Sequence, residues 1–315
     1  MPLFSIRKMI LNPIQQANFP EEKQLQRIVE ANLRTIFDCR FVASEFSTGP
    51  LHGGRVDTLA LSEDNNPVIV EYKKTASSDL INQSLFYLSW IRDHVGDFSM
   101  AAQTALGPDV QIDWSDIRVI CIAPNYKKYD LHAAQIIGDS IELWTYRMFE
   151  NSTIYFEQVQ RKAGTSDASA VAAATGAGKN PVMVAAGKKA AATRATGSYT
   201  FEQHLSTKPQ EIRQLAMAVQ DYLRGLDPMI EELPKKFYVA YRLSQNIACM
   251  EIQKTKVVLF LKLDPTKESG PKGISRNVSN IGHYGTGNLE ITLRRAEDFE
   301  AAKPLILKAY QSIGG

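Results

Sequence analysis

The spacing of hydrophobic residues changes along the first half of the chain. Between Pro20 and Phe37 apolar positions recur every three or four residues, which predicts a helix with one buried face. Beyond it, short apolar and β-branched runs bounded by turn-forming residues predict strands. The expected strands are Phe41–Phe46, Arg55–Leu61, Val68–Lys73, Ile117–Ala123, Ile141–Phe149 and Ile154–Val159, with further helices from Ser77 or Ser78 to about Asp93 and over Asp130–Ile137. This order predicts an α/β (α+β) domain with a mixed sheet flanked by helices.

The pattern stops between residues 161 and 198. This segment is rich in Ala, Gly, Ser and Thr, and it carries six basic side chains and one acidic side chain. It offers too little apolar surface to offset the entropy lost on ordering, so we expect a flexible basic linker. The predicted organisation is therefore a first domain over residues 1–160, a linker over 161–198 and a second domain over 199–315.

The second domain shows a different order of elements. It begins with a helical pattern and ends with another, and strand-like runs lie between them. The expected elements are a helix over Pro209–Leu226, strands over Phe237–Leu243, Ala248–Gln253, Val257–Leu263 and Leu289–Leu293, and a final helix over Ala296–Ser312. We expect a smaller α+β domain.

Composition argues against a membrane protein and against a secreted, disulfide-rich protein, but it does not indicate a particular reaction. The chain has 315 residues, 44% of them hydrophobic, and a formal net charge of +2. No apolar run reaches the roughly 18–20 residues of a membrane span, and Arg7 and Lys8 interrupt the only apolar stretch near the N-terminus, which argues against a secretion signal. The three cysteines are far apart, as expected for a reducing cytoplasm rather than a disulfide framework or zinc site. Because the net charge is close to zero, it does not by itself indicate nucleic-acid binding. That function can be inferred only from particular residues that form a site.

The most informative residues lie in the predicted hairpin of Arg55–Leu61 and Val68–Lys73. Around a turn of residues 62–67, the numbers of paired residues should add up to about 129, and those of Asp57 and Glu71 add up to 128. Directly opposed residues have Cβ atoms about 4.5–5.5 Å apart. Lys73 shares a face with Glu71, because residues two apart in a strand point the same way. The pattern therefore gathers two carboxylates and an ammonium.

Such a cluster of like charges between apolar flanks is unfavourable unless something binds there. Hard oxygen ligands without His or Cys suit Mg²⁺ or Mn²⁺, and Lys73 could orient an attacking water or stabilise charge on phosphorus. This set indicates phosphodiester hydrolysis. The alternative is a solvated hairpin with a surface ion pair.

Three neighbouring features add to this interpretation. Gln83 and Tyr87, four residues apart on the following helix, could contact a phosphate or a base, although an ordinary amphipathic helix also explains them. Either Glu22 or Glu30 on the first helix could complete an acidic shell. Gly53-Gly54 would allow a close backbone approach to a ligand, or could form a plain turn.

Together these residues resemble the PD-(D/E)XK nuclease superfamily, and most closely the NucS (EndoMS) type, with likeness to RecB-type nucleases. The resemblance spans roughly residues 18–125. It is carried by Glu22, Leu25–Asn32, Gly54–Asp57, Val70–Lys73 and Gln83–Tyr87. It implies an α-β-β-β-α-β core.

By this resemblance Asp57 and Glu71 are the metal ligands, and Lys73 is the catalytic lysine. Glu22 is the helix acid, because it lies ten residues before Asn32 as in that family. Gln83, Tyr87 and Arg55 are the implied nucleic-acid contacts.

Two departures from that family concern specificity and assembly. Leu33 stands where the family usually has Pro after Asn32, and the N-terminal DNA-binding and dimerising domain of the NucS proteins is absent, so their mismatch specificity does not carry over. A single site cuts one strand, so cleavage of both strands would need a homodimer or sequential nicking.

The second domain resembles an uncharacterised domain often attached to such nucleases, through Lys236–Tyr241 and Gly282–Glu290. Its loop Lys272–Asn288 is rich in Gly and could cradle phosphates or stack a base, or could simply be a long connection. His283 shows no orienting partner in the sequence.

The leading hypothesis is a cytoplasmic, Mg²⁺- or Mn²⁺-dependent nuclease in DNA repair or defence, with DNA favoured over RNA and no membrane partner. Two alternatives stay open: a module that binds nucleic acid without cutting it, and a regulatory interaction protein.

Overall fold

The computed structural model describes residues 2–75, 79–137, 141–159 and 199–315 and divides into two compact units, Met1–Thr165 and Ser166–Gly315. The expected linker and the expected helix caps Ser77 and Ser78 lie outside the described residues. Each unit is described by itself below. No helix among the described residues is both long and apolar enough to cross a bilayer.

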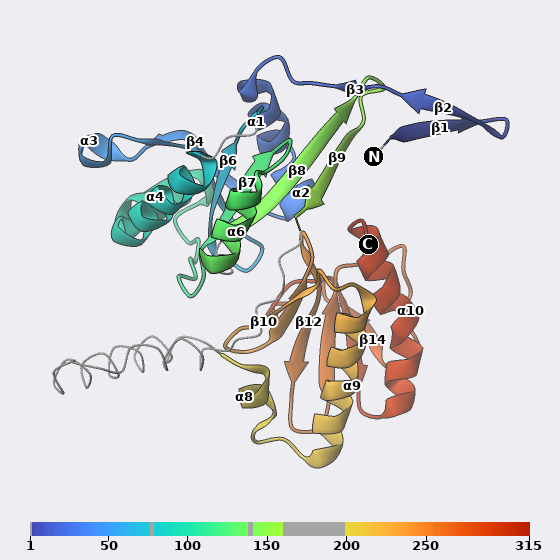
Figure 1. The fold of residues 1–315 in the computed structure, drawn as a ribbon. Helices are drawn as coiled ribbons and strands as arrows, with labels where there is room; N and C mark the ends of the chain where they lie inside the picture. Colours follow the sequence, from blue (N-terminus) through green and yellow to red (C-terminus); the bar gives the residue numbers. More distant parts are fainter. Residues whose placement is uncertain (1, 76–78, 138–140, 160–198) are drawn as a thin grey trace, which may run out of the picture. The chain divides into compact units, whose positions relative to one another are not determined.

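The first unit is built on a seven-stranded mixed sheet (Figure 1). Its central strands β6, β7 and β8 run parallel, and the remaining pairs are antiparallel. The strand order is β3 (Gln16–Ala17), β8 (Ile141–Phe149), β7 (Arg118–Ala123), β6 (Pro67–Tyr72), β5 (Arg55–Leu61) and β4 (Arg40–Ser47), with β9 (Ile154–Gln158) also paired to β8. This architecture confirms the predicted fold class.

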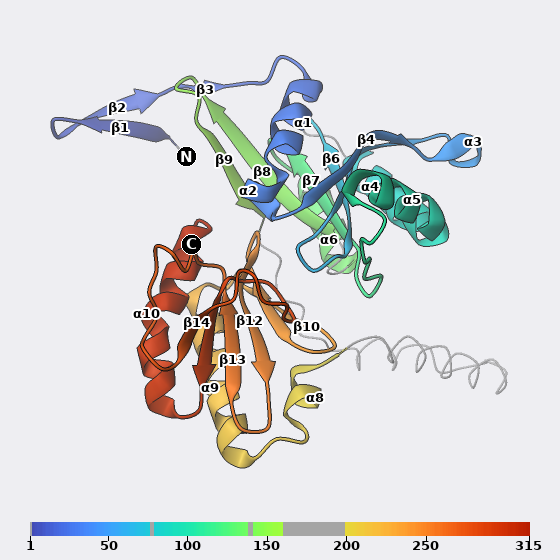
Figure 2. The same ribbon diagram turned by 180° about the vertical axis from the view of Figure 1, so that it is seen from behind.

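Helices cover both faces of this sheet, as the two opposite views show (Figures 1 and 2). One face packs against α1 (Glu22–Ala31) and α2 (Leu33–Phe37). The other packs against α4 (Asp79–Asp93), α5 (Val95–Leu106) and α6 (Lys128–Ile137). Along β5 and β6, Leu59 and Ile69 pack on the α4 side, whereas Ala60 and Val70 pack on the α1 side. By this alternation Asp57 and Glu71 belong to the α4 side.

Three local features differ from the sequence predictions. The helix expected over Pro20–Phe37 is broken at Asn32 (φ −126°, ψ 19°), which separates α1 from α2. The helices α5 and α3 (Gly49–His52) were not predicted. Near the N-terminus, β1 (Leu3–Arg7) and β2 (Ile10–Ile14) form an unpredicted hairpin whose turn residues Lys8 and Met9 both have positive φ.

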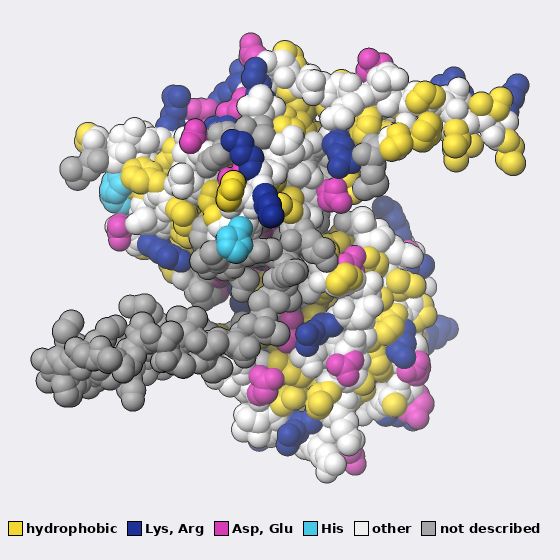
Figure 3. Space-filling model, viewed as in Figure 1, with side chains coloured by type: hydrophobic (Ala, Val, Ile, Leu, Met, Phe, Trp, Pro, Cys, Tyr) yellow, Lys and Arg dark blue, Asp and Glu magenta, His cyan; other side chains and the backbone are white. Residues whose placement is uncertain are grey.

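This N-terminal hairpin projects apolar side chains into solvent (Figure 3). Phe4, Ile6 and Leu11 are 41%, 74% and 60% exposed. Since Ile6 pairs with Leu11 and Phe4 with Pro13, these side chains share one face of a two-stranded ribbon.

The second unit is an antiparallel sheet with helices on one face (Figure 1). The sheet order is β10 (Glu231–Pro234), β11 (Val239–Arg242), β12 (Asn246–Ile252), β13 (Val257–Leu261), β15 (Leu289–Leu293) and β14 (Ser275–Asn277). The helices are α8 (Phe201–Leu205), α9 (Gln210–Leu226) and α10 (Ala296–Ser312). Figure 2 shows the opposite face of this sheet, which has no helices. A smaller apolar cluster that includes Cys249, Phe260 and Val278 lies on that face.

Candidate active site

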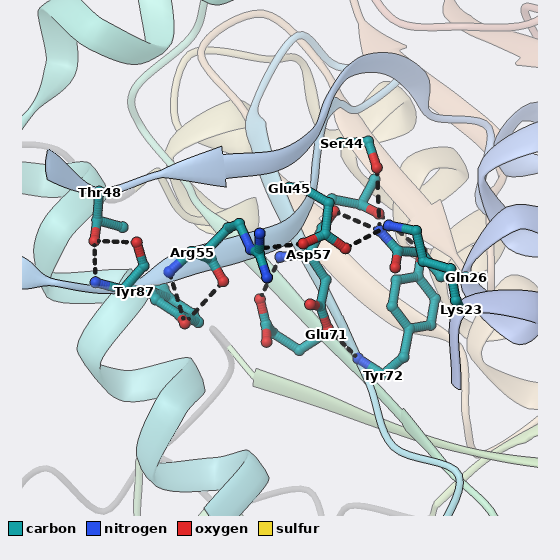
Figure 4. Close-up of polar contacts among 12 residues, drawn as sticks. Lys23, Gln26, Ser44, Glu45, Thr48, Arg55, Asp57, Glu71, Tyr72 and Tyr87 are labelled. Atoms are coloured by element: carbon teal, nitrogen blue, oxygen red, sulfur yellow. Dashed lines mark hydrogen bonds and ion pairs between the residues drawn. The ribbon is translucent and has the colours of Figure 1, made fainter. Parts of the chain in front are cut away.

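The two predicted metal ligands meet at the open end of the β5–β6 hairpin. The register pairs Thr58 with Val70 and Leu61 with Pro67, so Asp57 and Glu71 occupy the next opposed position. The backbone N–H of Asp57 donates to Oε1 of Glu71 at 3.0 Å, and the N–H of Tyr72 donates to Oδ2 of Asp57 at 3.1 Å (Figure 4). Each carboxyl group is therefore held by a backbone amide of this hairpin.

Burial makes this pair of carboxyl groups electrostatically costly. Glu71 is 2% exposed, and burial, followed by the nearby charge of Asp57, raises its pKa to about 9. Burial also raises the pKa of Asp57. Near neutral pH the pair therefore retains a proton, which a bound cation could replace.

The predicted catalytic lysine lies beside this pair. The positive charge of Lys73 opposes the rise in pKa of both Asp57 and Glu71. Its Nζ lies 3.3 Å from Oε1 of Glu22 at the first position of α1. The second oxygen of Glu22 accepts the backbone N–H of Lys74 at 2.9 Å. Of the two candidate helix acids, the structure therefore places Glu22 next to Lys73.

Glu30 belongs to a buried polar network on the α1 side of the hairpin. Its Oε1 accepts from Thr58 Oγ1 at 2.6 Å and from Gln26 Nε2 at 2.9 Å. Gln26 is 3% exposed, and its Nε2 also lies 2.8 Å from the carbonyl oxygen of Asp57 and 3.1 Å from Ser44 Oγ. Gln26 thus ties α1 to the backbone of a predicted metal ligand. This role of Gln26 was not predicted, although a polar residue beside Leu25 on the buried face of the helix was a signal for it.

Tyr87 is engaged with the backbone at the start of β5. Its hydroxyl donates to the carbonyl oxygen of Arg55 at 2.9 Å and lies 3.3 Å from the Arg55 N–H. Gly54 leaves space for the ring, because a Cβ there would lie 3.0 Å from it. The Tyr87 side chain therefore fixes the strand that carries Asp57, and its expected contact with nucleic acid stays a prediction.

Gln83 lies one helical turn before Tyr87. Its Oε1 is buried and has no hydrogen-bond partner among the described residues. An unsatisfied buried amide oxygen is unusual in a folded protein, but within the described part of the chain no hydrogen bond links the Gln83 side chain to Asp57 or Glu71.

A group of opposite charges borders the site on the β4 side. Glu45 lies between the paired positions Ser44–Thr58 and Phe46–Val56, opposite Asp57. Its carboxylate bridges Lys23 Nζ at 2.5 Å and Arg55 Nε at 2.7 Å, and the hydrogen bond from Lys23 lowers the pKa of Glu45. Glu45 has φ +53°, a strained conformation for a residue with a side chain. The sequence prediction included Arg55 but neither Lys23 nor Glu45.

No complete metal cage is present in the parts of the chain that the structure describes: no group of three or more His, Cys, Asp or Glu residues there is arranged to hold an ion. The candidate site therefore offers two carboxyl groups, a lysine beside them and a charged border.

Comparisons with known proteins agree with parts of this picture. Residues 201–313 match the family described as "Domain of unknown function (DUF5655)", as expected for the C-terminal part. An uncharacterized protein of Haemophilus influenzae is 28% identical over 313 residues, which cover 98% of this chain and 99% of that protein.

Two solved nucleases also match, with 16% identity each. For an EndoMS–double-stranded DNA complex the TM-score is 0.29, over 45% of this chain and 64% of the other. For a repair endonuclease from Pyrococcus abyssi it is 0.23, over 41% and 48%. The chain thus spans less than two thirds of either structure. These scores are too low to establish a common fold, so the case for a nuclease depends on the site itself.

Proposed function

We propose that the first unit is a metal-dependent nuclease that hydrolyses phosphodiester bonds. The observation that carries this proposal is the opposition of the partly buried Asp57 and the buried Glu71, two carboxyl groups with raised pKa values beside Lys73. A fold gains nothing in stability from two like charges at such a position. A binding site for a cation explains why both are there.

The donor chemistry fits Mg²⁺ or Mn²⁺. Both ligands supply oxygen, and Mg²⁺ is commonly held by one or two carboxylates, with water and substrate phosphate completing its shell. The carboxyl groups repel one another when both are charged, and a divalent cation would relieve the same repulsion that a retained proton relieves. When bound, the metal would lower the pKa of a water molecule and polarise the phosphate.

The other residues have roles that follow from their contacts. Glu22 holds the Lys73 ammonium, so that Lys73 can stabilise charge on the phosphate or orient water. Lys23 and Arg55, held together by Glu45, present positive charge at the border, where a phosphate of the strand could replace the Glu45 carboxylate. Gln26 and Tyr87 position Asp57 through the backbone.

The substrate in this proposal is DNA rather than RNA, with Arg55, Gln83 and Tyr87 nearest to the strand. Residues 1–160 form the nuclease domain, residues 161–198 connect it to the second domain, and a homodimer would allow both strands of a duplex to be cut.

A panel of labelled substrates tests this function. Single-stranded, duplex, mismatched and flapped DNA, and RNA, are incubated with the protein in Mg²⁺, Mn²⁺ or EDTA. Glu71→Gln keeps an oxygen for the Asp57 N–H but removes the charge, and should reduce cleavage about a thousandfold or more. Glu157→Gln, which alters a half-exposed carboxylate on β9, is the control. Metal-dependent binding without cleavage would favour the non-cutting alternative, and full activity of Glu71→Gln would exclude the proposed site.

A further inference from the structure

The sheet of the second unit has a face without helices, and a loop of residues 278–288 lies directly on it. The N–H of Val278 donates to the carbonyl oxygen of Asn288 at 2.9 Å, which closes the loop at its base. Gly287 has φ +127°, and a Cβ there would lie 2.7 Å from the backbone of Phe260. A Cβ at Gly285 would lie 2.6 Å from Cys249. Only glycine allows so close an approach to β12 and β13.

Two adjoining cavities lie beside this loop. The first, of about 260 Å³, is lined by apolar residues of β13 and the loop, by the aromatic residues His283 and Tyr284, and by polar residues that include Glu251 and Gln253. The second, of about 290 Å³, is lined by Lys256, Arg276 and Arg294 together with backbone and hydroxyl groups. The two share Lys256, Arg276 and Glu290. The first cavity is thus suited to a flat ring that carries polar groups, and its neighbour to an anion.

Aromatic rings in this region are already stacked in pairs. His283 lies parallel to Phe260, with ring centroids 4.3 Å apart and planes at 16°. The hydrogen bond between its Nδ1 and the carbonyl oxygen of Ile281, 2.8 Å long, fixes the ring. Tyr284 stacks on Phe237 at 4.2 Å and 24°, and Tyr284 is 51% exposed. A further flat ring can extend such a stack without moving the protein.

The cations differ in how far they are neutralised. Arg276 forms an ion pair with Glu290 on the neighbouring strand. The side chains of Lys256 and Arg294 form no ion pair or hydrogen bond within the described part of the chain. They therefore leave positive charge free for a ligand anion at the second cavity.

We propose that the two cavities bind one nucleotide unit, with its base at the first cavity and its phosphate at the second, next to Lys256 and Arg294. The unit could come from a free mononucleotide or from a single strand of nucleic acid. The binding itself does not depend on the proposed nuclease function, although that function would make a strand the natural source.

The test uses the full chain in EDTA, so that no metal-dependent cleavage can occur. Binding is measured by calorimetry with AMP and CMP and by fluorescence anisotropy with fluorescein-labelled single-stranded octanucleotides. Lys256→Gln and Arg294→Gln should each weaken binding about tenfold. Lys254→Gln, in the same turn but outside both cavities, should leave it unchanged.

A second pair of variants tests the aromatic half of the site. Tyr284→Ala should weaken binding about tenfold, since base stacking is worth about 1–3 kcal/mol, and Tyr155→Ala, at a similarly exposed tyrosine of the first unit, should not. Both replaced side chains are partly in solvent, so the fold should persist, and circular dichroism checks this.

The outcomes distinguish a free mononucleotide from a single strand as the ligand. They also distinguish failure of the nucleotide site from failure of the proposed nuclease function. Binding of AMP or CMP as tight as that of the octanucleotides indicates a free nucleotide, and binding of octanucleotides alone indicates a strand. No binding of any probe, or binding unaffected by Lys256→Gln and Tyr284→Ala, overturns the inference. If Glu71→Gln abolishes cleavage but the protein still binds nucleotides in EDTA, both proposals are supported. If the wild-type protein binds nucleotides but never cleaves nucleic acid, only the proposed nuclease function is excluded.

Discussion

The two units use charged side chains in opposite ways. In the first, the partly buried Asp57 lies opposite the buried Glu71, and their repulsion is offset by backbone hydrogen bonds, by Lys73 and by a retained proton. In the second, Arg276 and Glu290 neutralise one another across two strands, while Lys256 and Arg294 stay unpaired among the described residues at the edge of a cavity. A buried pair of like charges indicates a cation, and accessible unpaired cations beside aromatic rings indicate an anion with a flat group.

The largest effect is expected from the carboxyl pair of the first unit. In EDTA, this pair should make the free energy of unfolding depend on pH. Because the folded-state pKa of Glu71 is raised to about 9, the folded protein holds a proton that the unfolded chain loses near pH 4–5. The free energy of unfolding should therefore fall as the pH rises from about 5 to about 9, by at most about 1.4 kcal/mol per pH unit for one proton. Denaturant unfolding at a series of pH values measures this slope.

Two variants show whether this slope comes from the carboxyl pair of the first unit or from the ion pair of the second. Glu71→Gln should flatten the slope, whereas Glu290→Gln, a change in the second unit, should leave it in place because it leaves the Asp57–Glu71 pair intact. Mg²⁺ should restore stability at alkaline pH in the wild-type protein and not in Glu71→Gln. An equal slope in wild type and Glu71→Gln would mean that the carboxyl pair is not the source.

A smaller effect separates two neighbouring lysines. Lys73→Gln removes the ammonium beside the carboxyl pair and should reduce the cleavage rate about a hundredfold. Lys74→Gln should have little effect, because among the described residues Lys74 Nζ donates only to the carbonyl oxygen of Pro20. Initial rates in Mg²⁺ compare them, and equal losses would assign both lysines to general attraction of the strand.

Smaller again is the effect of the polar network behind the hairpin. Gln26→Ala removes the buried amide that donates to the Asp57 carbonyl oxygen and to Glu30, which keeps only its bond from Thr58 among the described residues. This loss should reduce the free energy of unfolding by about 1–3 kcal/mol. Gln24→Ala, at an exposed position of the same helix, is the control. If Gln26→Ala were as stable as wild type, the network would not position Asp57.

The smallest expected change is that of Tyr87→Phe, which removes only the hydroxyl that binds the Arg55 backbone. It should cost about 1 kcal/mol of stability, measured by thermal unfolding. A loss of cleavage far beyond the change in stability would instead support the predicted contact of Tyr87 with nucleic acid.

The sequence predicted most strands of the two sheets because each is a short apolar run between turn residues, whereas the short strands β3, β10 and β14 were not predicted. It also predicted the opposition of Asp57 and Glu71, since the register of a hairpin follows from the position of its turn. The unpredicted hairpin has a different cause. Lys8 and Met9 both adopt positive φ, which such turns usually achieve with Asn and Gly, so no local signal marked the turn.

The rest of the site depends on contacts between distant segments. Gln26 acts on Asp57 only once α1 lies against the hairpin, and Glu45 joins Lys23 to Arg55 across α1, β4 and β5. No spacing within one segment encodes such an arrangement. Likewise, nothing in the predicted helix distinguished Glu22 from Glu30 until their partners were known.

The hairpin that carries Asp57 and Glu71 also has a consequence for the order of folding. The turn between β5 and β6 closes within a few residues, whereas the parallel partner of β6, β7, begins 46 residues after β6 ends, at Arg118. Loop closure favours local contacts first, so the two acids should meet before the central parallel strands are in place. Their mutual repulsion would then oppose an early step of folding unless the pair takes up a proton as it forms, so we expect refolding to be faster at pH 5 than at pH 9.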